Sequence, residues 1–205
     1  MVEKEIVKIS KFLSLILRHR PEMVGIVLDE NGWTDVQTLI HKCDVYAVGV
    51  KFNFDDLKYV VATNNKKRFS FNEDFSKIRA SQGHSVEVDL GYKPQQPPEK
   101  LYHGTGRNSV SSILKTGLEK RGRQHVHLCI NSGVARTVGA RHGVPVVFVV
   151  DSGDMARDGF EFFLSDNGVW LTDNVPRKYI GMSIDDICWL KDKGKLSEDS
   201  YELFS

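Results

Sequence analysis

Three basic side chains stand where an apolar helical pattern stops. Apolar residues recur with helical spacing as far as Leu17, and Arg18, His19 and Arg20 follow directly before Pro21. Proline disfavours a helical conformation in the residue before it, so the pattern predicts a buried helix that ends in these three side chains. They either complement the helix dipole or form an anion site in which arginine binds phosphate and histidine carries a proton.

A glycine-containing stretch in the second half of the chain is another candidate site. His103, Gly104 and Thr105 end a short predicted strand, and a glycine there lets a ligand approach the backbone closely. The stretch matches neither the glycine pattern of Rossmann folds nor that of P-loops. It therefore indicates a ligand only in combination with other evidence, because an ordinary strand end has the same appearance.

Two histidines, His125 and His127, face the same side of a further predicted strand, because side chains alternate along a strand. Paired histidines can bind zinc, but no third ligand stands at a spacing typical of zinc sites. Cys129 lies on the same face and is interpreted as a small buried apolar residue. We therefore predict no metal site.

The composition is that of an ordinary globular protein, with 40% apolar and 27% charged residues. The 205 residues suffice for one large or two small domains. No apolar run is long enough to span a membrane, and the N-terminus lacks the apolar core of a signal peptide. Cys43, Cys129 and Cys188 are scattered and odd in number, which favours a reducing, cytoplasmic setting over a disulfide framework.

The formal net charge of +1 conceals an uneven distribution. Residues 100–150 contain eight lysines and arginines against the single acid Glu119, whereas residues 151–205 contain twelve acids against six bases. The basic block is consistent with a polyanionic partner. It is equally consistent with a solvated face that happens to be basic.

The first 90 residues predict a lobe of three helices followed by a small hairpin. The helices are expected at residues 3–19, from Thr34 as an N-cap to residue 43, and after Asn53 as an N-cap. Strands are expected at residues 67–71 and 77–81, and the first of them begins beside the basic cluster of residues 66–68. This order of elements is typical of a winged-helix-like lobe.

A proline-rich stretch at residues 91–99 predicts a stiff linker between two domains. Beyond it, residues 100–205 predict many short strands and two short helices, the pattern of a split α+β sheet rather than a doubly wound one. Strands are expected at residues 101–105, 125–128, 145–150, 160–164, 168–172 and 178–180, and helices at 109–115 and 132–142.

Eight segments occur in an order that is specific as a set. They are SKFLSLILRHRP, LDENGWTDVQTLI, KKRFSF, IRASQGHS, LYHGT, RQHVHL, ARTVGARHG and NGVWLT. Over residues 8 to about 180 the chain resembles the RNA 2′-phosphotransferase family, NAD-dependent enzymes that remove a 2′-phosphate from tRNA splice junctions. The resemblance implies a winged-helix-like N-terminal lobe, a C-terminal ADP-ribosyltransferase-like lobe, and NAD⁺ as a consumed co-substrate without a metal.

The resemblance also assigns roles to particular residues. It implies a catalytic group made of Arg18, His19, Arg68 and Arg123. It implies an NAD-binding group made of His103, Gly104, Thr105, His127 and Val169. Cys129 stands where the family usually has serine, and Val169 stands where many protein-modifying ADP-ribosyltransferases have glutamate.

The implied reaction has two steps. An internal RNA 2′-phosphate displaces nicotinamide to give an ADP-ribosylated 2′-phosphate, which then yields 2′-OH RNA and ADP-ribose 1″-2″ cyclic phosphate. The expected partners are tRNA carrying an internal 2′-phosphate and NAD⁺, with no membrane, and the expected state is a cytoplasmic monomer. Two alternatives stay open: ADP-ribosylation of a terminal RNA or DNA phosphate that stops after the first step, and a non-catalytic RNA-binding module.

Overall fold

Helix α1 (Glu3–Ile16) begins the computed structural model, which describes residues 2–47, 49–182 and 186–187. The helix ends at Ile16, so the prediction that it continues to residue 19 is wrong. The backbone N–H groups of His19 and Arg20 both donate to the Leu15 carbonyl, which closes the chain into a turn ahead of Pro21. Arg18 and His19 therefore lie in this turn, beyond the last helical residue.

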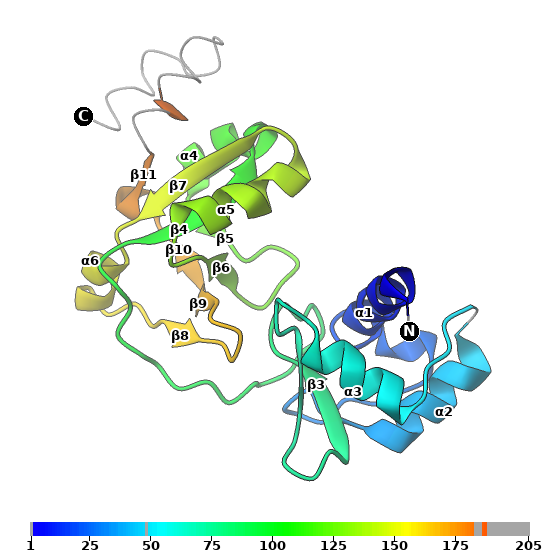
Figure 1. Cartoon of the computed structure of the whole chain (residues 1–205). Coiled ribbons are helices and arrows are strands. Elements are labelled where there is room, and N and C mark those ends of the chain that lie inside the picture. Colours follow the sequence, from blue (N-terminus) through cyan, green and yellow to red (C-terminus); the bar gives the residue numbers. More distant parts are fainter. Residues whose placement is uncertain (1, 48, 183–185, 188–205) are drawn as a thin grey trace. The chain divides into compact units, whose positions relative to one another are not determined.

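The chain forms two compact units, each with its own hydrophobic core (Figure 1). Unit 1 comprises residues 1–92 together with the short segments 122–124 and 165–167. Unit 2 comprises residues 93–121, 125–164 and 168–205. Two segments that come late in the sequence thus pack with the first 92 residues.

Unit 1 combines three α-helices, a short helical turn and a three-stranded antiparallel sheet with the order β1-β3-β2. After α1 its elements are η1 (Pro21–Met23), β1 (Thr34–Asp35), α2 (Val36–Tyr46), α3 (Phe54–Ala62), β2 (Phe69–Phe71) and β3 (Lys77–Ala80). Apolar side chains of all three α-helices and of β2 and β3 form its core. The hairpin β2–β3 thus lies within 67–81, as predicted.

Two helix N-caps of unit 1 test the sequence predictions directly. Asn53 caps α3 as predicted: its side chain accepts from the Asp56 N–H at 2.9 Å, and the Asp56 carboxylate accepts from the Asn53 N–H at 3.0 Å. Thr34 does not cap α2, because it lies in β1 opposite Ile78. Asp35 is the N-cap instead, and its carboxylate accepts from the Thr38 N–H at 2.6 Å.

Unit 2 contains three small sheets in which every described strand pair is antiparallel, as expected for an α+β protein. The first has the order β11-β7-β4: β11 (Ile180–Met182), β7 (Pro145–Val150) and β4 (Leu101–Gly106). The second has the order β6-β9-β8: β6 (Val126–Leu128), β9 (Trp170–Thr172) and β8 (Phe163–Leu164). The third pairs β10 (Asn174–Val175) with β5 (Leu118–Glu119).

The helical segments of unit 2 are short. They are η2 (Arg107–Ser109), α4 (Val110–Thr116), α5 (Ser132–Gly139), η3 (Ala140–His142), α6 (Ser152–Arg157) and η4 (Arg177–Tyr179). The strand predicted at 178–180 is wrong, because residues 177–179 form η4 and the strand β11 begins only at Ile180. Helix α6 was not predicted, since six residues are too few to show a helical period.

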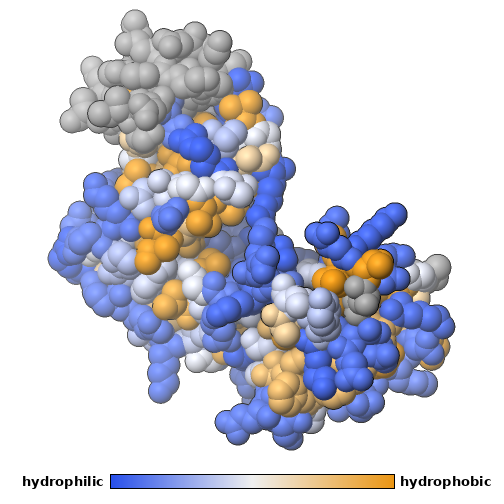
Figure 2. All heavy atoms as spheres, in the orientation of Figure 1, coloured by the Kyte–Doolittle hydropathy of each residue, from blue (hydrophilic) through white to orange (hydrophobic). Residues whose placement is uncertain are grey.

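The surface of each unit is mostly hydrophilic on the face drawn in Figure 2, with hydrophobic side chains in groups among the polar ones. No helix among the described residues is long and apolar enough to cross a membrane. Cys43 and Cys129 are free thiols, and Cys188 lies outside the described residues.

Candidate active site

Three segments of unit 1 bring the four basic residues Arg18, His19, Arg68 and Arg123 together; we call them the basic quartet. Arg18 and His19 come from the turn after α1, Arg68 from the residue before β2, and Arg123 from segment 122–124. The Arg18 Nη2 atom donates to the Arg68 carbonyl at 3.4 Å. The four residues that the family resemblance selects thus interact in one place.

The electrostatics of the basic quartet favour an anion. Burial, followed by the charges of Arg68 and Arg123, lowers the pKa of Arg18 to about 10, which still leaves it charged at neutral pH. Loss of hydration, followed by Arg18 and Arg123, lowers the pKa of His19, so its imidazole is neutral near pH 7. Because the charges that cause both shifts are cations, a bound dianion relieves the repulsion and raises both pKa values.

Backbone carbonyls fix the loop that presents Arg68. Ser81 donates from its hydroxyl to the Lys67 carbonyl and from its N–H to the Arg68 carbonyl, each at 2.8 Å. Asn167 of the segment 165–167 donates through Nδ2 to the Lys66 carbonyl at 3.0 Å. Lys67 itself has a φ of 41°, a left-handed conformation that side-chain-bearing residues adopt only when their surroundings enforce it.

Segment 122–124 is fixed through the residue that follows Arg123. The Gln124 N–H donates to the His84 carbonyl at 3.2 Å, and its side-chain Nε2 donates to the Val88 carbonyl at 2.8 Å.

Sequence reasoning missed Ser81 and Gln124. Their only signal was membership of the ordered segments IRASQGHS and RQHVHL, since hydrogen bonds to backbone carbonyls impose no recognisable spacing.

Unit 2 holds the second group of predicted residues, four of them on the strands β4 and β6. The His103 Nδ1 atom lies 3.0 Å from the carbonyl of His127, and β4 also meets the β6 segment through the bridge between Tyr102 and Cys129. Because side chains alternate along a strand, His103 and Thr105 of β4 share one face. His103 is half-buried and Thr105 is buried.

Gly104 faces the opposite side of β4, toward α5. A Cβ atom placed on Gly104 would lie 1.6 Å from the Ala135 carbonyl oxygen of α5, and one on Gly106 would lie 2.2 Å from the His142 carbonyl oxygen. Glycine is therefore required here for close packing of α5 and η3 on the strand. This is a different reason from the close approach of a ligand that the sequence suggested, and a ligand role for Gly104 stays a prediction.

Comparisons with known proteins identify the family to which this chain belongs. A model of the "RNA 2′-phosphotransferase, Tpt1 / KptA family" matches residues 4–174. A protein of Flavobacterium johnsoniae is 56% identical over 172 residues, which cover 84% of this chain and 93% of the relative. A protein of Trichormus variabilis is 54% identical over 176 residues, 86% of this chain and 96% of the relative. Both carry the name "probable RNA 2′-phosphotransferase".

The chain belongs to the RNA 2′-phosphotransferase family. The stretch that matches the RNA 2′-phosphotransferase model contains the basic quartet of unit 1 and all five residues of the second group in unit 2. Val169, the last of these, is half-buried and directly precedes β9, where Leu171 pairs with His127. Among the residues that the structure describes, no three histidines, cysteines or carboxylates cluster as metal ligands would.

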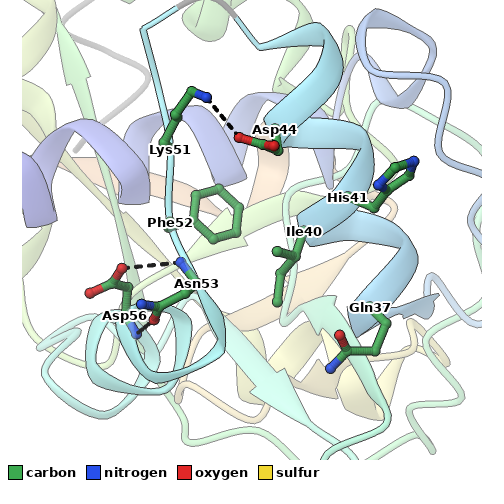
Figure 3. Close-up of a pocket in the computed structure, with 8 residues that line it drawn as sticks. All are labelled: Gln37, Ile40, His41, Asp44, Lys51, Phe52, Asn53 and Asp56. Carbon is green, nitrogen blue, oxygen red and sulfur yellow. Dashed lines mark hydrogen bonds and ion pairs between the residues drawn. The ribbon is translucent and has the colours of Figure 1, made fainter.

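One groove of this RNA 2′-phosphotransferase lies apart from the basic quartet. It has a volume of about 550 Å³ and lies between α2 and the start of α3 in unit 1 (Figure 3). Four of its polar residues interact in pairs: Lys51 pairs with Asp44 at 2.9 Å, and Asn53 and Asp56 form the cap of α3. None of the basic quartet lines the groove, so we assign it no part in the reaction.

Proposed function

We propose that this RNA 2′-phosphotransferase transfers an internal RNA 2′-phosphate to NAD⁺, giving 2′-OH RNA, ADP-ribose 1″-2″ cyclic phosphate and nicotinamide. The observation that supports the proposal is the basic quartet, in which Arg18 lies among Arg68 and Arg123, and Arg18 and Arg123 act on the His19 imidazole and lower its pKa. Guanidinium forks match the geometry of phosphate oxygens. A neutral imidazole beside them can accept or donate a proton near neutral pH.

In the first step the guanidinium groups of Arg18, Arg68 and Arg123 hold the 2′-phosphate. One phosphate oxygen forms a bond to C1″ of the nicotinamide ribose, and the bond from C1″ to nicotinamide breaks. Nicotinamide leaves a pyridinium as a neutral molecule, so this step needs positioning and electrostatic stabilisation rather than a strong acid. The product of this step is the ADP-ribosylated 2′-phosphate of the RNA.

In the second step O2″ of the same ribose attacks phosphorus, and the bond from phosphorus to the RNA 2′-oxygen breaks. O2″ loses a proton and the RNA 2′-oxygen gains one. His19 is the group of the basic quartet that can deliver this proton, because imidazole titrates near neutrality. The arginines stabilise the charge that builds on the phosphate oxygens in this step as well.

The residues of unit 2 supply the NAD⁺ side of the proposal. His103 and Thr105 share one face of β4, and the His127 carbonyl orients the His103 ring through Nδ1. Val169 offers no base, which suits an acceptor phosphate that is already ionised. We propose that unit 1 is the winged-helix-like RNA-binding lobe and unit 2 the ADP-ribosyltransferase-like lobe of a cytoplasmic monomer.

The decisive experiment identifies both products. The protein is incubated with NAD⁺ and an oligonucleotide that carries one internal 2′-phosphate, in parallel with and without EDTA. We expect 2′-OH RNA and ADP-ribose 1″-2″ cyclic phosphate at equal rates in both. A stable ADP-ribosylated end would favour the terminal-phosphate alternative, absence of nicotinamide release would favour the RNA-binding module, and loss of turnover in EDTA would contradict metal independence.

A further inference from the structure

The His19 ring has a specific partner on a distant part of unit 1. Its Nδ1 atom lies 3.0 Å from the hydroxyl of Ser85, which is 66 residues away in the sequence. The backbone of the same segment binds the neighbouring residue, because the N–H groups of Ser85 and Val86 donate to the Arg18 carbonyl at 2.9 and 3.3 Å. Side chain and backbone of residues 85–86 therefore hold both Arg18 and His19.

The segment from Ser81 to Val88, which we call the 81–88 segment, contacts each of the three chain segments that carry the basic quartet. Ser81 donates to the carbonyls of both Lys67 and Arg68. His84 and Val88 accept the two hydrogen bonds of Gln124, next to Arg123. A single stretch of chain thus joins the three separate segments that carry the four basic residues.

The 81–88 segment is anchored in the interior of unit 1 and is therefore suited to this task. Ser81 is fully buried, and His84 is only 1% exposed. The Ser81 carbonyl accepts from the Tyr92 hydroxyl at 2.6 Å. The ring of His84 lies against the turn at Gly32, where a Cβ atom would stand 3.5 Å from His84 Nε2. Ser85 itself is exposed, so its hydroxyl projects from a fixed backbone.

We propose that Ser85 is a positioning residue for His19, and that its hydroxyl fixes the plane and the tautomer of the imidazole. A neutral imidazole carries one proton, so a partner at Nδ1 determines what Nε2 can do. Because His19 delivers a proton in the proposed reaction, the hydroxyl donates to Nδ1 and Nε2 carries the proton. The proposal rests on the function proposed above for its effect on rate.

The test compares three serine variants in the full chain. Ser85→Ala removes the hydroxyl, and Ser85→Thr keeps it. Ser14→Ala is the matched control, because the Ser14 hydroxyl donates only within α1, to the Ser10 carbonyl at 2.8 Å. Turnover is measured with NAD⁺ and the 2′-phosphorylated oligonucleotide. The tautomer of His19 is measured at pH 7.5 from its ¹⁵N ring shifts, which the spectrum of His19→Gln assigns.

We expect Ser85→Ala to slow turnover about threefold to tenfold, as for the loss of one neutral hydrogen bond. The ¹⁵N shifts of His19 should move toward the average of the two tautomers. Ser85→Thr should restore most of the rate and the shifts, and Ser14→Ala should match the wild type. Unchanged turnover in Ser85→Ala would overturn the proposal, and so would slower turnover with unchanged His19 shifts.

The two proposals can fail separately. If the wild type gives no product from the oligonucleotide while Ser85→Ala still changes the His19 shifts, the proposed function is wrong and the positioning by Ser85 stands. If the wild type turns over and Ser85→Ala alters neither rate nor shifts, the function stands and the positioning role is wrong.

Discussion

In the proposed reaction His19 serves the second step alone, whereas Arg68 serves both steps, so their alanine variants should fail at different points. Loss of a positioned proton carrier costs about 10²–10⁴-fold, concentrated in the step that uses it. Loss of a charge-assisted phosphate contact costs roughly tenfold to a hundredfold. His19→Ala should therefore accumulate the ADP-ribosylated 2′-phosphate, visible as a slower gel band, whereas Arg68→Ala should also slow its appearance.

The control for this comparison is Lys67→Ala, which removes the exposed charge next to Arg68 and leaves the Lys67 carbonyl that binds Ser81. It should form and consume the intermediate at close to the wild-type rates. If His19→Ala releases no nicotinamide at all, His19 acts in the first step and the role given to it here is wrong.

His103 should affect NAD⁺ rather than RNA. Its ring is oriented by the His127 carbonyl in unit 2, whereas the basic quartet lies in unit 1. His103→Ala should raise the apparent KM for NAD⁺ and leave oligonucleotide affinity, measured by fluorescence anisotropy, nearly intact. His142→Ala, an exposed histidine of the same unit, should change neither quantity. Equal damage to both quantities in His103→Ala would contradict the assignment of NAD⁺ to unit 2.

The sequence predicted which basic residues lie together in unit 1 better than it predicted the contacts that hold them. From the residues alone, Arg18 and His19 were compatible with simple dipole complementation or with an anion site. The structure places them beyond the end of α1, beside Arg68 and Arg123. The partner Ser85 could not be predicted, because a contact across 66 residues leaves no local pattern.

At the scale of the elements, the packing of α5 on β4 depends on Gly104. A Cβ atom there would lie 1.6 Å from the Ala135 carbonyl oxygen, so Gly104→Ala forces the helix away from the strand. Overpacking of this kind costs about 1–3 kcal/mol or more. Thermal unfolding of Gly104→Ala should show a clearly lower midpoint, whereas Gly181→Ala, on β11 of the same sheet with no atom within 4 Å of its Cβ position, should change it little.

His84 should make the stability of unit 1 fall in acid. Burial, followed by the charges of Arg18, His19 and Arg79, lowers the pKa of His84 to about 4 from the ordinary 6.5. The unfolded chain therefore binds more protons than the folded one between these values, so the free energy of unfolding decreases as pH falls from 6.5 to 4. The full difference is about 3 kcal/mol on the scale of 1.36 kcal/mol per pKa unit.

The measurement for His84 is urea unfolding at pH 7.5 and pH 4.5. His84→Gln should lose clearly less stability between the two values than the wild type does. The lowered pKa of His19 in unit 1 acts in the same direction, as does that of His125 on unit 2, and both persist in this variant. His41→Gln, at an exposed position of α2, is the control and should keep the wild-type difference. An equal loss in His84→Gln and the wild type would show that another group titrates.

The elements that the sequence predicted well are those with enough residues to show a period. Helices α2 and α3 lie where apolar periodicity predicts them, and strand β7 lies where an unbroken apolar run predicts it. The two-residue strands β1, β5 and β10 could not be predicted, because two residues have no alternation to read and owe their pairing to tertiary contacts. The three-residue turn η4 is likewise too short to show a period, and the sequence predicts a strand at its position.

At the scale of the whole molecule, the continuous sequence does not correspond to two continuous units. Segments 122–124 and 165–167 pack with residues 1–92, although each is embedded in the sequence of unit 2. Asp166 accepts from Arg79 at 3.3 Å, and its N–H donates to the Tyr92 hydroxyl at 3.2 Å. No compositional shift or periodicity marks these segments, so sequence patterns do not show that they belong to unit 1.

A fragment that ends at residue 92 should therefore be less stable than unit 1 in the full chain. It loses the hydrogen bonds that Gln124, Asp166 and Asn167 form with residues 1–92. At about 0.5–1.5 kcal/mol each, these bonds together contribute roughly 3 kcal/mol or more to the stability of unit 1. Hydrogen exchange measured by mass spectrometry should show faster exchange of residues 77–92 in the fragment than in the full chain.

The variant Arg79→Met tests whether the fragment is less stable because it lacks Asp166 or because a shortened chain frays at its end. In the full chain Arg79 is mostly buried, stacks on Trp33 and pairs with Asp166, so its replacement should destabilise unit 1. In the fragment Asp166 is missing, and the buried guanidinium has lost its carboxylate. Arg79→Met should therefore cost less in the fragment than in the full chain. An equal cost in both would show that segment 165–167 does not support unit 1 through this pair.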